Sequence, residues 1–576
     1  MSLRLVIFLM LAVLNGPRLA VAEDVTLCRG VVASEPVSPA LDDLEKRLVC
    51  GDDREGWRNV PHNQAKFQLR SFLQARGYHR AEFESRGEIL YVTVNEPTRI
   101  SKITASGEPE PLDITRRRGI TGQILTPARL NELEAWVKKK LGEHGFACPQ
   151  VRSRANPDTG AVVVEVEEGR ALPVAAVLEE PSLLPPGVLR RYDAFQLGRL
   201  YDERELALTE RRILSEGIVQ AVRFEVDCRE QGVFIEQKVT PGLPRAFSFG
   251  FGFNTEDGFR VRGGWRHSRL FRMSSSVDVM AVASLREQKI ESTMKWYLLP
   301  QVSRFYLLPK VTVRREDEPK YELLNVAGHF IPTYEMDTDS WFIRAGVGPT
   351  LEETRLLEGV GPGFSRLLLL TSDIEGMSHD FEFNRNEPVS GMRLNLRTGH
   401  VLSHGNARVN AHQFRLDGQW LVNFASFEPP LLVLGGRFGF ATTAAESVGQ
   451  IVTELPAQFR YFLGGLSNLR GFGRQELPFH GVGALTMGFV GLEARSTGLL
   501  PQNLQPYLFV DAGQLGSNSW TLQNEVYWSP GLGLRWSSPI GVFRFNVAHG
   551  NVANAQPETP QGLSHWQFYL AYGEEF

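Results

Sequence analysis

The 576-residue sequence lacks several features that would place it in a familiar functional class. Lysine and arginine number 62 against 66 aspartate and glutamate, a net charge of -4, so the chain has no basic excess of the kind that nucleic-acid binding needs. It contains no G-x-S-x-G elbow, no G-x-x-x-x-G-K-[ST] phosphate loop and no H-E-x-x-H zinc motif. These absences argue against a nucleic-acid partner, a cofactor, a bound metal and an enzymatic function.

Cysteine is scarce as well. The four cysteines are Cys28, Cys50, Cys148 and Cys228, and all of them precede Pro241. Their spacings match no zinc or C-x-x-C pattern. An exported chain meets an oxidising compartment, which favours a disulfide, and Cys28 and Cys50 are the candidate pair because they are near in sequence. Buried or reactive free thiols are an equal alternative, and the connectivity stays open.

Long apolar runs are missing except near the N-terminus. There Arg4 precedes an apolar run over 5–14, breakers follow at 15–17, and Ala20-Val21-Ala22 completes the pattern. This order predicts a secretory signal peptide over residues 1–22, cleaved after Ala22. The run is too short to span a bilayer as a helix, and a retained anchor is the alternative interpretation. The chain is therefore predicted to be exported.

One unit recurs about every 70 residues between Glu23 and Thr240. Each copy has a helix that ends at a glycine and then two strands separated by a second glycine. The helices end at Gly77, Gly145 and Gly217, and the strands cover 80–85 and 88–94, 148–154 and 161–166, and 219–227 and 233–239. We predict modules over 23–98, 99–168 and 169–243.

An apolar strand and a shorter helix are expected upstream of each main helix, at 25–28 and 39–49, 100–105 and 112–118, and 173–178 and 187–192. The predicted unit is β-α-α-β-β, a small sheet with two helices on one face. The first copy is the weakest, because the polar stretch 34–59 carries only a faint helix. A free sheet edge can pair with an extended peptide, although inert spacers are the alternative.

The pattern changes after Pro244, where helical spacing gives way to alternation. Every second residue from Phe247 to Phe253 is phenylalanine, and the residues between are small or polar. Strands of about ten residues with aromatics on one face and arginines on the other are typical of transmembrane barrels. We predict α+β periplasmic repeats followed by an all-β membrane domain, an antiparallel barrel of about 16 strands over 244–576. A soluble β-sandwich is the alternative.

The segment 462–473 breaks this alternation and includes Arg470-Gly471-Phe472-Gly473. It resembles the (V/I/L)RG(F/Y) loop motif of the outer-membrane barrel-assembly superfamily with POTRA repeats, the BamA and TamA family. The resemblance covers essentially the whole mature chain. Three repeats, about 16 strands and such a loop between the eleventh and twelfth strands are together similar to the TamA-like members.

The resemblance implies that this loop folds back into the barrel and that its arginine meets acidic residues of neighbouring strands. The matching positions are Arg470, Glu493 and Asp511. The alternation along the two strands agrees with this assignment. If Leu508 and every second residue after it face lipid, Asp511 points into the lumen, and if Leu492 faces lipid, Glu493 points into the lumen as well. A buried arginine needs carboxylate partners to offset its desolvation. An exposed loop arginine is the alternative.

The first strand must close the barrel against the last strand, and glycines at 250 and 252 weaken its packing. We hypothesise that this seam lends its edges to an incoming substrate strand by main-chain pairing. The predicted seam residues are Phe247, Phe249, Gly250, Gly252, Phe568, Leu570, Tyr572 and Phe576.

The resemblance implies a factor that assembles or translocates proteins in the outer-membrane lipid bilayer of a Gram-negative cell. Its partners would be unfolded outer-membrane proteins or autotransporters and a TamB-like periplasm-spanning protein, docked on the repeats. The alternative is a two-partner-secretion type transporter for one dedicated exoprotein. Such transporters typically have two repeats behind a plug helix, so three repeats favour the assembly factor. A passive porin lacks both the repeats and the loop motif.

Overall fold

The computed structural model describes residues 24–573 apart from 53–59, 108, 110–111, 180–183, 186, 272, 299–303, 384–387, 405–409, 446–454, 480, 502, 539–540 and 556–564. The predicted signal peptide and the predicted seam residue Phe576 lie outside the described residues. The chain divides into two compact units, Met1–Ala171 and Leu172–Phe576, which are described separately. None of the helices in the described ranges is long and apolar enough to cross a membrane.

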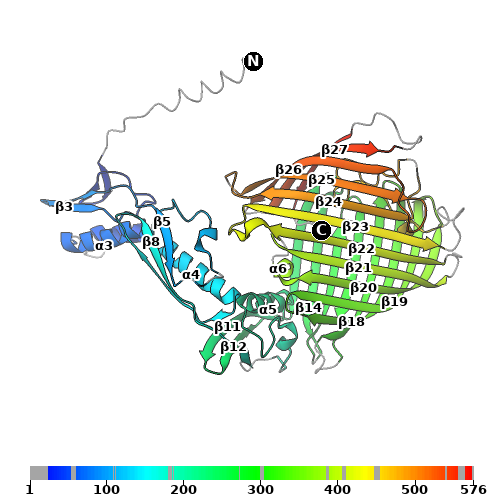
Figure 1. The fold of residues 1–576 in the computed structure, drawn as a ribbon, viewed down its shortest axis with the longest axis horizontal. Coiled ribbons are helices and arrows are strands. Elements are labelled where there is room, and N and C mark those ends of the chain that lie inside the picture. Colours follow the sequence, from blue (N-terminus) through cyan, green and yellow to red (C-terminus); the bar gives the residue numbers. More distant parts are fainter. Residues whose placement is uncertain are drawn as a thin grey trace, which may run out of the picture. The chain divides into compact units, whose positions relative to one another are not determined.

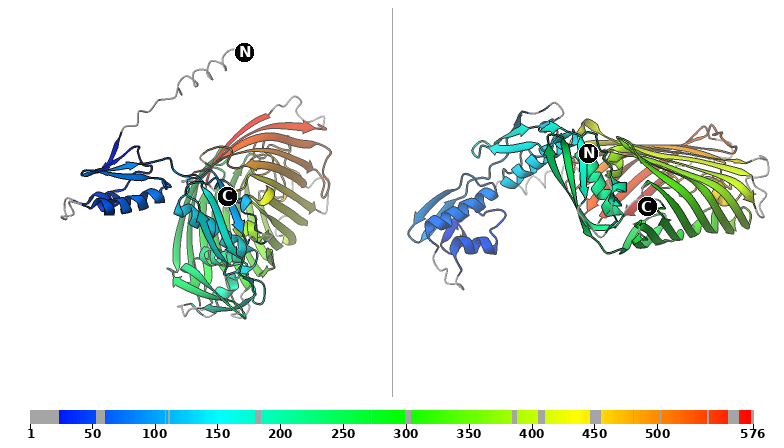
Figure 2. Two further views of the ribbon diagram at one scale, coloured as in Figure 1. Left: turned by 60° about the vertical axis from the view of Figure 1, so that its left-hand side comes forward. Right: turned by 90° about the horizontal axis from the view of Figure 1, so that it is seen from below.

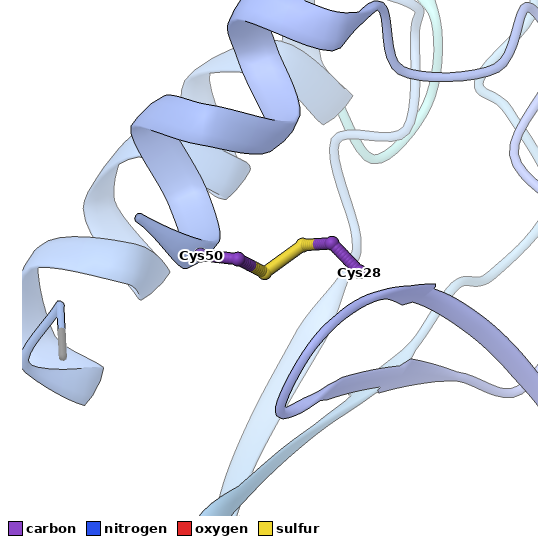
Figure 3. The surroundings of a disulfide bond; sticks show 2 residues. All are labelled: Cys28 and Cys50. Carbon is purple, nitrogen blue, oxygen red and sulfur yellow. A yellow bond between two sulfur atoms is a disulfide. The ribbon is translucent and has the colours of Figure 1, made fainter. Parts of the chain in front are cut away.

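The first module of the N-terminal unit is a four-stranded sheet covered by two helices. Its elements are β1 (Val25–Cys28), β2 (Val31–Ala33), α2 (Asp43–Cys50), α3 (His62–Ala75), β3 (Glu82–Arg86) and β4 (Ile89–Thr93). The strand order is β1-β2-β4-β3. Asp42 and Glu45 form a reciprocal capping box that starts α2, and Leu69 and Leu73 of α3 are fully buried against the sheet. A disulfide joins Cys28 of β1 to Cys50 at the end of α2 (Figure 3).

The second module has a three-stranded sheet with one long helix. Its elements are β5 (Lys102–Ser106), the 3-10 turn η1 (Ile114–Arg116), α4 (Pro127–Glu143), β6 (Phe146–Ala147), β7 (Gln150–Ala155), β8 (Ala161–Glu167) and β9 (Arg170–Ala171). The Thr126 side chain caps the first turn of α4 and Pro127 occupies its first position, which suits a residue without an N–H. Val137 and Leu141 of α4 are buried against the sheet.

The second unit begins with a third module of the same design. Its elements are β10 (Val174–Glu179), the 3-10 turn η2 (Leu189–Tyr192), α5 (Glu203–Ser215), β11 (Val219–Arg229) and β12 (Gly232–Pro241). In each module the second strand of the hairpin pairs in parallel with an upstream strand and antiparallel with its hairpin partner: β2-β4-β3, β5-β8-β7 and β10-β12-β11. This shared pairing is the structural form of the repeat found in the sequence.

Two details differ from the predicted unit. The upstream helices expected at 112–118 and 187–192 are single 3-10 turns, whereas the first module, where the pattern was faintest, has the full helix α2. Glycines with positive φ explain the shortening, since Gly119 follows η1 and Gly187 precedes η2. The strand of the first module that matches β5 and β10 is β2, because the predicted strand 25–28 pairs only at the outer edge of the sheet.

The rest of the second unit is a closed antiparallel barrel of 16 strands, as predicted, in which every strand pairs with its neighbour in the chain (Figure 1; Figure 2). The strands are β13 (Arg245–Asn254), β14 (Gly258–Leu270), β15 (Ser275–Ala283), β16 (Glu287–Lys295), β17 (Phe305–Glu318), β18 (Tyr321–Asp337), β19 (Trp341–Gly359), β20 (Phe364–Ser378), β21 (Gly391–His404), β22 (Ala411–Asn423), β23 (Leu432–Ala445), β24 (Thr486–Ser496), β25 (Leu504–Gly516), β26 (Val526–Ser538), β27 (Gly541–Ala553) and β28 (His565–Tyr572).

The barrel strands alternate between an apolar outer face and a polar inner face. On β25, Leu508 and Val510 of the outer face are 67% and 41% exposed. Asp511, which follows Val510 and faces inward, is fully buried. Short helical segments lie between strands: α6 (His379–Phe383), η3 (Phe424–Ser426) and η4 (Ala457–Phe459). Residues 455–479, between the eleventh and twelfth strands β23 and β24, fill part of the lumen.

Candidate functional site in the barrel lumen and at its seam

Residues 455–479, between β23 and β24, fold into a compact loop inside the barrel. Leu463 and Leu477 pair through two backbone hydrogen bonds of 3.1 and 3.0 Å, and Gly465 N–H donates to the Phe472 carbonyl at 2.9 Å. Leu463, Leu469, Phe472 and Leu477 are fully buried and form one apolar cluster with side chains of the barrel wall. The loop therefore has its own core, and this core fixes the direction in which Arg470 points.

Arg470 lies against the two carboxylates that the sequence suggested for it. Its Nε and Nη2 donate to the two oxygens of Asp511 at 2.7 and 2.9 Å, and its backbone N–H adds a third hydrogen bond to the same group at 3.2 Å. Its Nη1 donates to Glu493 at 3.2 Å. Only 6% of Arg470 and none of Asp511 is exposed, so a bidentate, charge-assisted pair is shielded from water.

Three further residues complete this network. Arg437 on β23 donates to Asp511 at 3.0 Å and to the carbonyls of loop residues 466–468 at 3.0 to 3.2 Å. Arg495 donates to Glu493. The Arg470 guanidinium carbon lies 3.5 Å from the centre of the Phe509 ring, a close cation–π contact. Each carboxylate thus serves two arginines, and the loop backbone is held by Arg437 as well as by Arg470.

Gly471 brings the loop against strands β26 and β27. Its φ is +107°, and a Cβ at this position would lie 2.6 Å from the Ser529 Cβ and 3.0 Å from the Gly550 nitrogen. A side chain there would be strained and would push the loop off the wall. Phe472 follows with its ring among the aromatic rings of Phe479 and Tyr527. Gly473 N–H donates to the Glu476 carboxylate, which closes the turn after the motif.

The seam between β13 and β28 is short. Among the described residues the two strands share two register pairs, Phe253 with Tyr572 and Asn254 with Ala571, and the Thr255 N–H donates to the Leu570 carbonyl at 3.1 Å. The next shortest junction of the barrel, β16 with β17, has seven register pairs. Most of β13 and most of β28 therefore lie beyond their mutual pairing.

The predicted seam residues that the structure describes lie on β13 and β28, mostly outside the paired positions. Phe247 and Phe249 are 83% and 79% exposed on the outer face of β13, and Phe568 and Leu570 are 60% and 43% exposed on β28. Tyr572 belongs to a register pair, and its ring lies 5.6 Å from that of Phe251. Gly250 and Gly252 are on the opposite face of β13, where they carry no side chain to pack on β28.

Comparison with known proteins identifies the barrel. Residues 373–576 match the family model of the Omp85 superfamily domain. The chain carries an Omp85 superfamily domain. An Omp85 barrel lies in the outer membrane of a Gram-negative cell, and the N-terminal modules lie in the periplasm.

Three solved structures match this chain in fold over most of its length. BamA from Haemophilus ducreyi lacking POTRA domains 1–3 matches 82% of this chain and 99% of its own at 17% identity and a TM-score of 0.49. CdiB from Escherichia coli matches 88% and 97% at 13% identity and a TM-score of 0.46. CdiB from Acinetobacter baumannii matches 82% and 89% at 13% identity and a TM-score of 0.45. At these TM-scores the likenesses carry no functional assignment.

The third module is fastened to the periplasmic rim of the Omp85 barrel by a second buried ion network. Arg212 of α5 binds Asp337 at 2.8 and 3.0 Å and Glu382 of α6 at 2.6 and 2.8 Å. One turn later, Glu216 accepts hydrogen bonds from Lys295 at 2.5 Å and from Arg266. These residues carry no motif, and the sequence did not single them out.

The sequence pattern could have placed two further network residues in the lumen. Phe509 is two residues before Asp511, so period two already places it on the inner face of β25 in the Omp85 barrel. Arg437 alternates with outward residues of β23 in the same way. Arg474 had no such signal, because it belongs to the loop and its partners are on distant strands.

Proposed function

We propose that this protein is an outer-membrane assembly factor that helps other β-barrel proteins or autotransporters to fold into the membrane. The observation that carries the proposal is the short seam, where β13 and β28 share two register pairs in the part of the chain that the structure describes. A strand edge in lipid has no water to satisfy its N–H and C=O groups, so an open edge favours pairing with another strand. The seam is thus the place where this barrel wall accepts a substrate strand.

The side chains of β13 suit this role. Phe247, Phe249 and Phe251 are exposed on the outer face, where lipid solvates them. A substrate strand that pairs with this edge and alternates in the same way continues the barrel wall without burying a polar residue in lipid. The substrate class that fits is an unfolded transmembrane strand, recognised mainly by its backbone hydrogen-bonding groups and by its alternation of apolar and polar side chains.

The periplasmic modules supply the second part of the proposal. Each sheet ends in an edge strand, β3, β7 and β11 in the three modules. Edge strands accept extended peptides by β-augmentation. We assign to these edges the docking of unfolded substrate and of a periplasm-spanning TamB-like partner, with module boundaries at 98/99, 168/169 and 243/244.

The second candidate, export of one dedicated exoprotein, needs a lumen that a chain can pass. In the described part of the barrel, the buried core of the inward loop and the Arg470 network occupy that space. Export would require this network to come apart, whereas strand addition at the seam leaves it in place. The geometry therefore supports assembly better than export.

A locked seam tests the proposal. Phe253→Cys with Tyr572→Cys places thiols on a register pair of the seam, and Val261→Cys with Ala283→Cys places them on a register pair of β14 and β15 as the matched control. Each variant replaces the wild-type gene, and the outer-membrane proteome is compared before and after oxidation.

We expect oxidation of the seam pair to abolish assembly of particular barrels or autotransporters and oxidation of the control pair to leave it unchanged. Normal assembly by a fully cross-linked seam would refute the proposal. Loss of one secreted protein, with the barrel proteome intact, would support the export function instead.

A further inference from the structure

The turn between β13 and β14 aims two carboxylates at the inward loop. The Asn254 side chain accepts hydrogen bonds from the backbone N–H groups of Glu256 and Asp257 at 2.9 and 2.7 Å, which fixes the turn. The Glu256 carboxylate accepts the N–H of loop residue Leu466 at 3.1 and 3.2 Å. Asp257 accepts Arg474 Nη1 at 2.7 Å. The first seam strand is therefore attached to the loop at its outer end.

Arg474 connects this turn to the end of β17. Its Nε and Nη2 donate to the Glu318 carboxylate at the end of β17 at 2.7 and 2.5 Å, while Nη1 binds Asp257. The Glu318 and Asp257 side chains are 7% and 14% exposed, so both ion pairs are largely shielded from water. Charge-assisted hydrogen bonds of this kind are roughly twice as strong as neutral ones.

The same loop is attached to the last seam strand. The Tyr569 hydroxyl on β28 donates to the Phe472 carbonyl at 2.8 Å, and Tyr569 is only 3% exposed. The Phe472 ring lies 5.9 Å from the ring of His565, at the start of the same strand. One short segment of chain thus contacts both strands that close the barrel.

We propose that loop residues 464–476 form a clasp that holds the seam closed from inside the lumen. Arg470 anchors the clasp to the wall, Arg474 and the Leu466 N–H hold β13, and the Phe472 carbonyl holds β28. The direct pairing between the strands is too short to close the barrel with the strength of its other junctions. Opening the seam accordingly means releasing one side of the clasp.

The role of the clasp rests on the proposed function. In that function, the clasp keeps the seam shut when no substrate strand is present. The β13 side is held by short charge-assisted hydrogen bonds, whereas the β28 side is held by one neutral hydrogen bond, the ring contact of His565 with Phe472 and a longer 3.7 Å contact of His565 with Glu476. The clasp is therefore expected to release β28 first and to keep β13 attached to the loop.

Hydrogen–deuterium exchange of the full-length protein in detergent micelles without substrate tests the clasp. Arg474→Gln removes the ion pairs of the β13 side, and Tyr569→Phe removes only the hydroxyl of the β28 side. Arg315→Gln is the matched control, because Arg315 donates to Glu322 at 2.8 and 2.6 Å across β17 and β18, away from the loop. Asp257→Asn breaks the same ion pair from the other side if Arg474→Gln does not fold.

In Arg474→Gln we expect the amides of 253–257 and 565–572 to exchange on the order of tenfold faster, the effect of losing one strong buried interaction. Tyr569→Phe should accelerate the same amides about threefold, and Arg315→Gln should leave them unchanged. Wild-type exchange of both seam segments in folded Arg474→Gln and Tyr569→Phe would overturn the clasp. Fast exchange in these variants, combined with normal assembly by the locked seam, would keep the clasp and refute the proposed function.

Discussion

Replacing Arg470 by alanine removes the anchor of the inward loop, and the structure allows the cost to be worked out. The substitution deletes two hydrogen bonds to Asp511, one to Glu493 and the contact with the Phe509 ring. It spares the backbone hydrogen bond from residue 470 to Asp511. It also spares Arg437, which continues to neutralise that carboxylate.

Removal of one partner of a buried ion pair costs about 3 to 5 kcal/mol, because the remaining charge is left without compensation. Asp511 keeps one arginine, so we expect the lower end of that range, about 3 kcal/mol, as the loss in the free energy of unfolding. Arg470→Lys keeps the charge but loses the planar fork that binds both oxygens of Asp511, and we expect about half of that loss.

Urea-induced unfolding of the purified protein in detergent micelles, followed by tryptophan fluorescence, measures these values by linear extrapolation. Arg397→Ala is the matched control, since Arg397 is 56% exposed and lies 3.4 Å from Asp373 on the barrel wall. We expect the control to change the free energy of unfolding by less than about 0.5 kcal/mol. An Arg470→Ala protein as stable as the control would show that the Asp511 network does not anchor the loop.

Three further predictions concern the periplasmic modules. Arg212→Ala removes the arginine that binds both Asp337 and Glu382, although Asp337 keeps Arg304 at 3.6 Å. This should loosen the third module from the barrel rim by about 3 kcal/mol, measured as faster protease cleavage after β12. Burial raises the pKa of Asp193 to about 7 and that of Glu205 to about 7. Because these folded-state values exceed the unfolded ones, the stability that the two groups contribute is fully present below about pH 4 and is lost as pH rises through 7, so the melting temperature should be higher at pH 5.5 than at pH 8. Replacing Cys28 and Cys50 by serine opens a loop with a sequence separation of 22, which should cost the first module roughly 3 kcal/mol in urea unfolding.

Each of these predictions has its own control. Arg204→Ala removes an exposed ion pair of the same helix, and cleavage as fast as that of Arg212→Ala would contradict a role for the rim network. The Asp193→Asn/Glu205→Gln variant should lose most of the pH dependence, whereas the exposed Glu230→Gln should retain it. Reduction of the wild-type disulfide should reproduce the stability of the serine variant, and an unchanged first module after reduction would contradict the third prediction.

Local patterns in the sequence accounted for much of the molecule. Period two along a strand is a property of neighbouring residues, so it located the barrel and placed Asp511 and Glu493 on the inner face. The glycines at the ends of the helices located the three modules for the same reason. The shortened helices η1 and η2 were missed, because a few polar residues between glycines have too little periodicity to reveal their length.

Contacts between distant segments could not be obtained in this way. Leu466 and Arg474 of the loop are 210 and 217 residues from their carboxylate partners in the first hairpin. No local pattern records such a distance. Only closure of the barrel brings the first hairpin, the inward loop and the last strand to one place.

The sequence by itself therefore determined the alternating strands and their approximate number, since both depend on residues close together in the chain, and the family resemblance of residues 462–473 pointed to Arg470 as the arginine that enters the lumen. Tertiary structure alone decided how far β28 overlaps β13 and which groups cross that junction. The reason is geometric, because the overlap depends on the accumulated stagger of all 16 strands. That stagger leaves two register pairs between the described residues of the seam strands and places the loop where it contacts both sides.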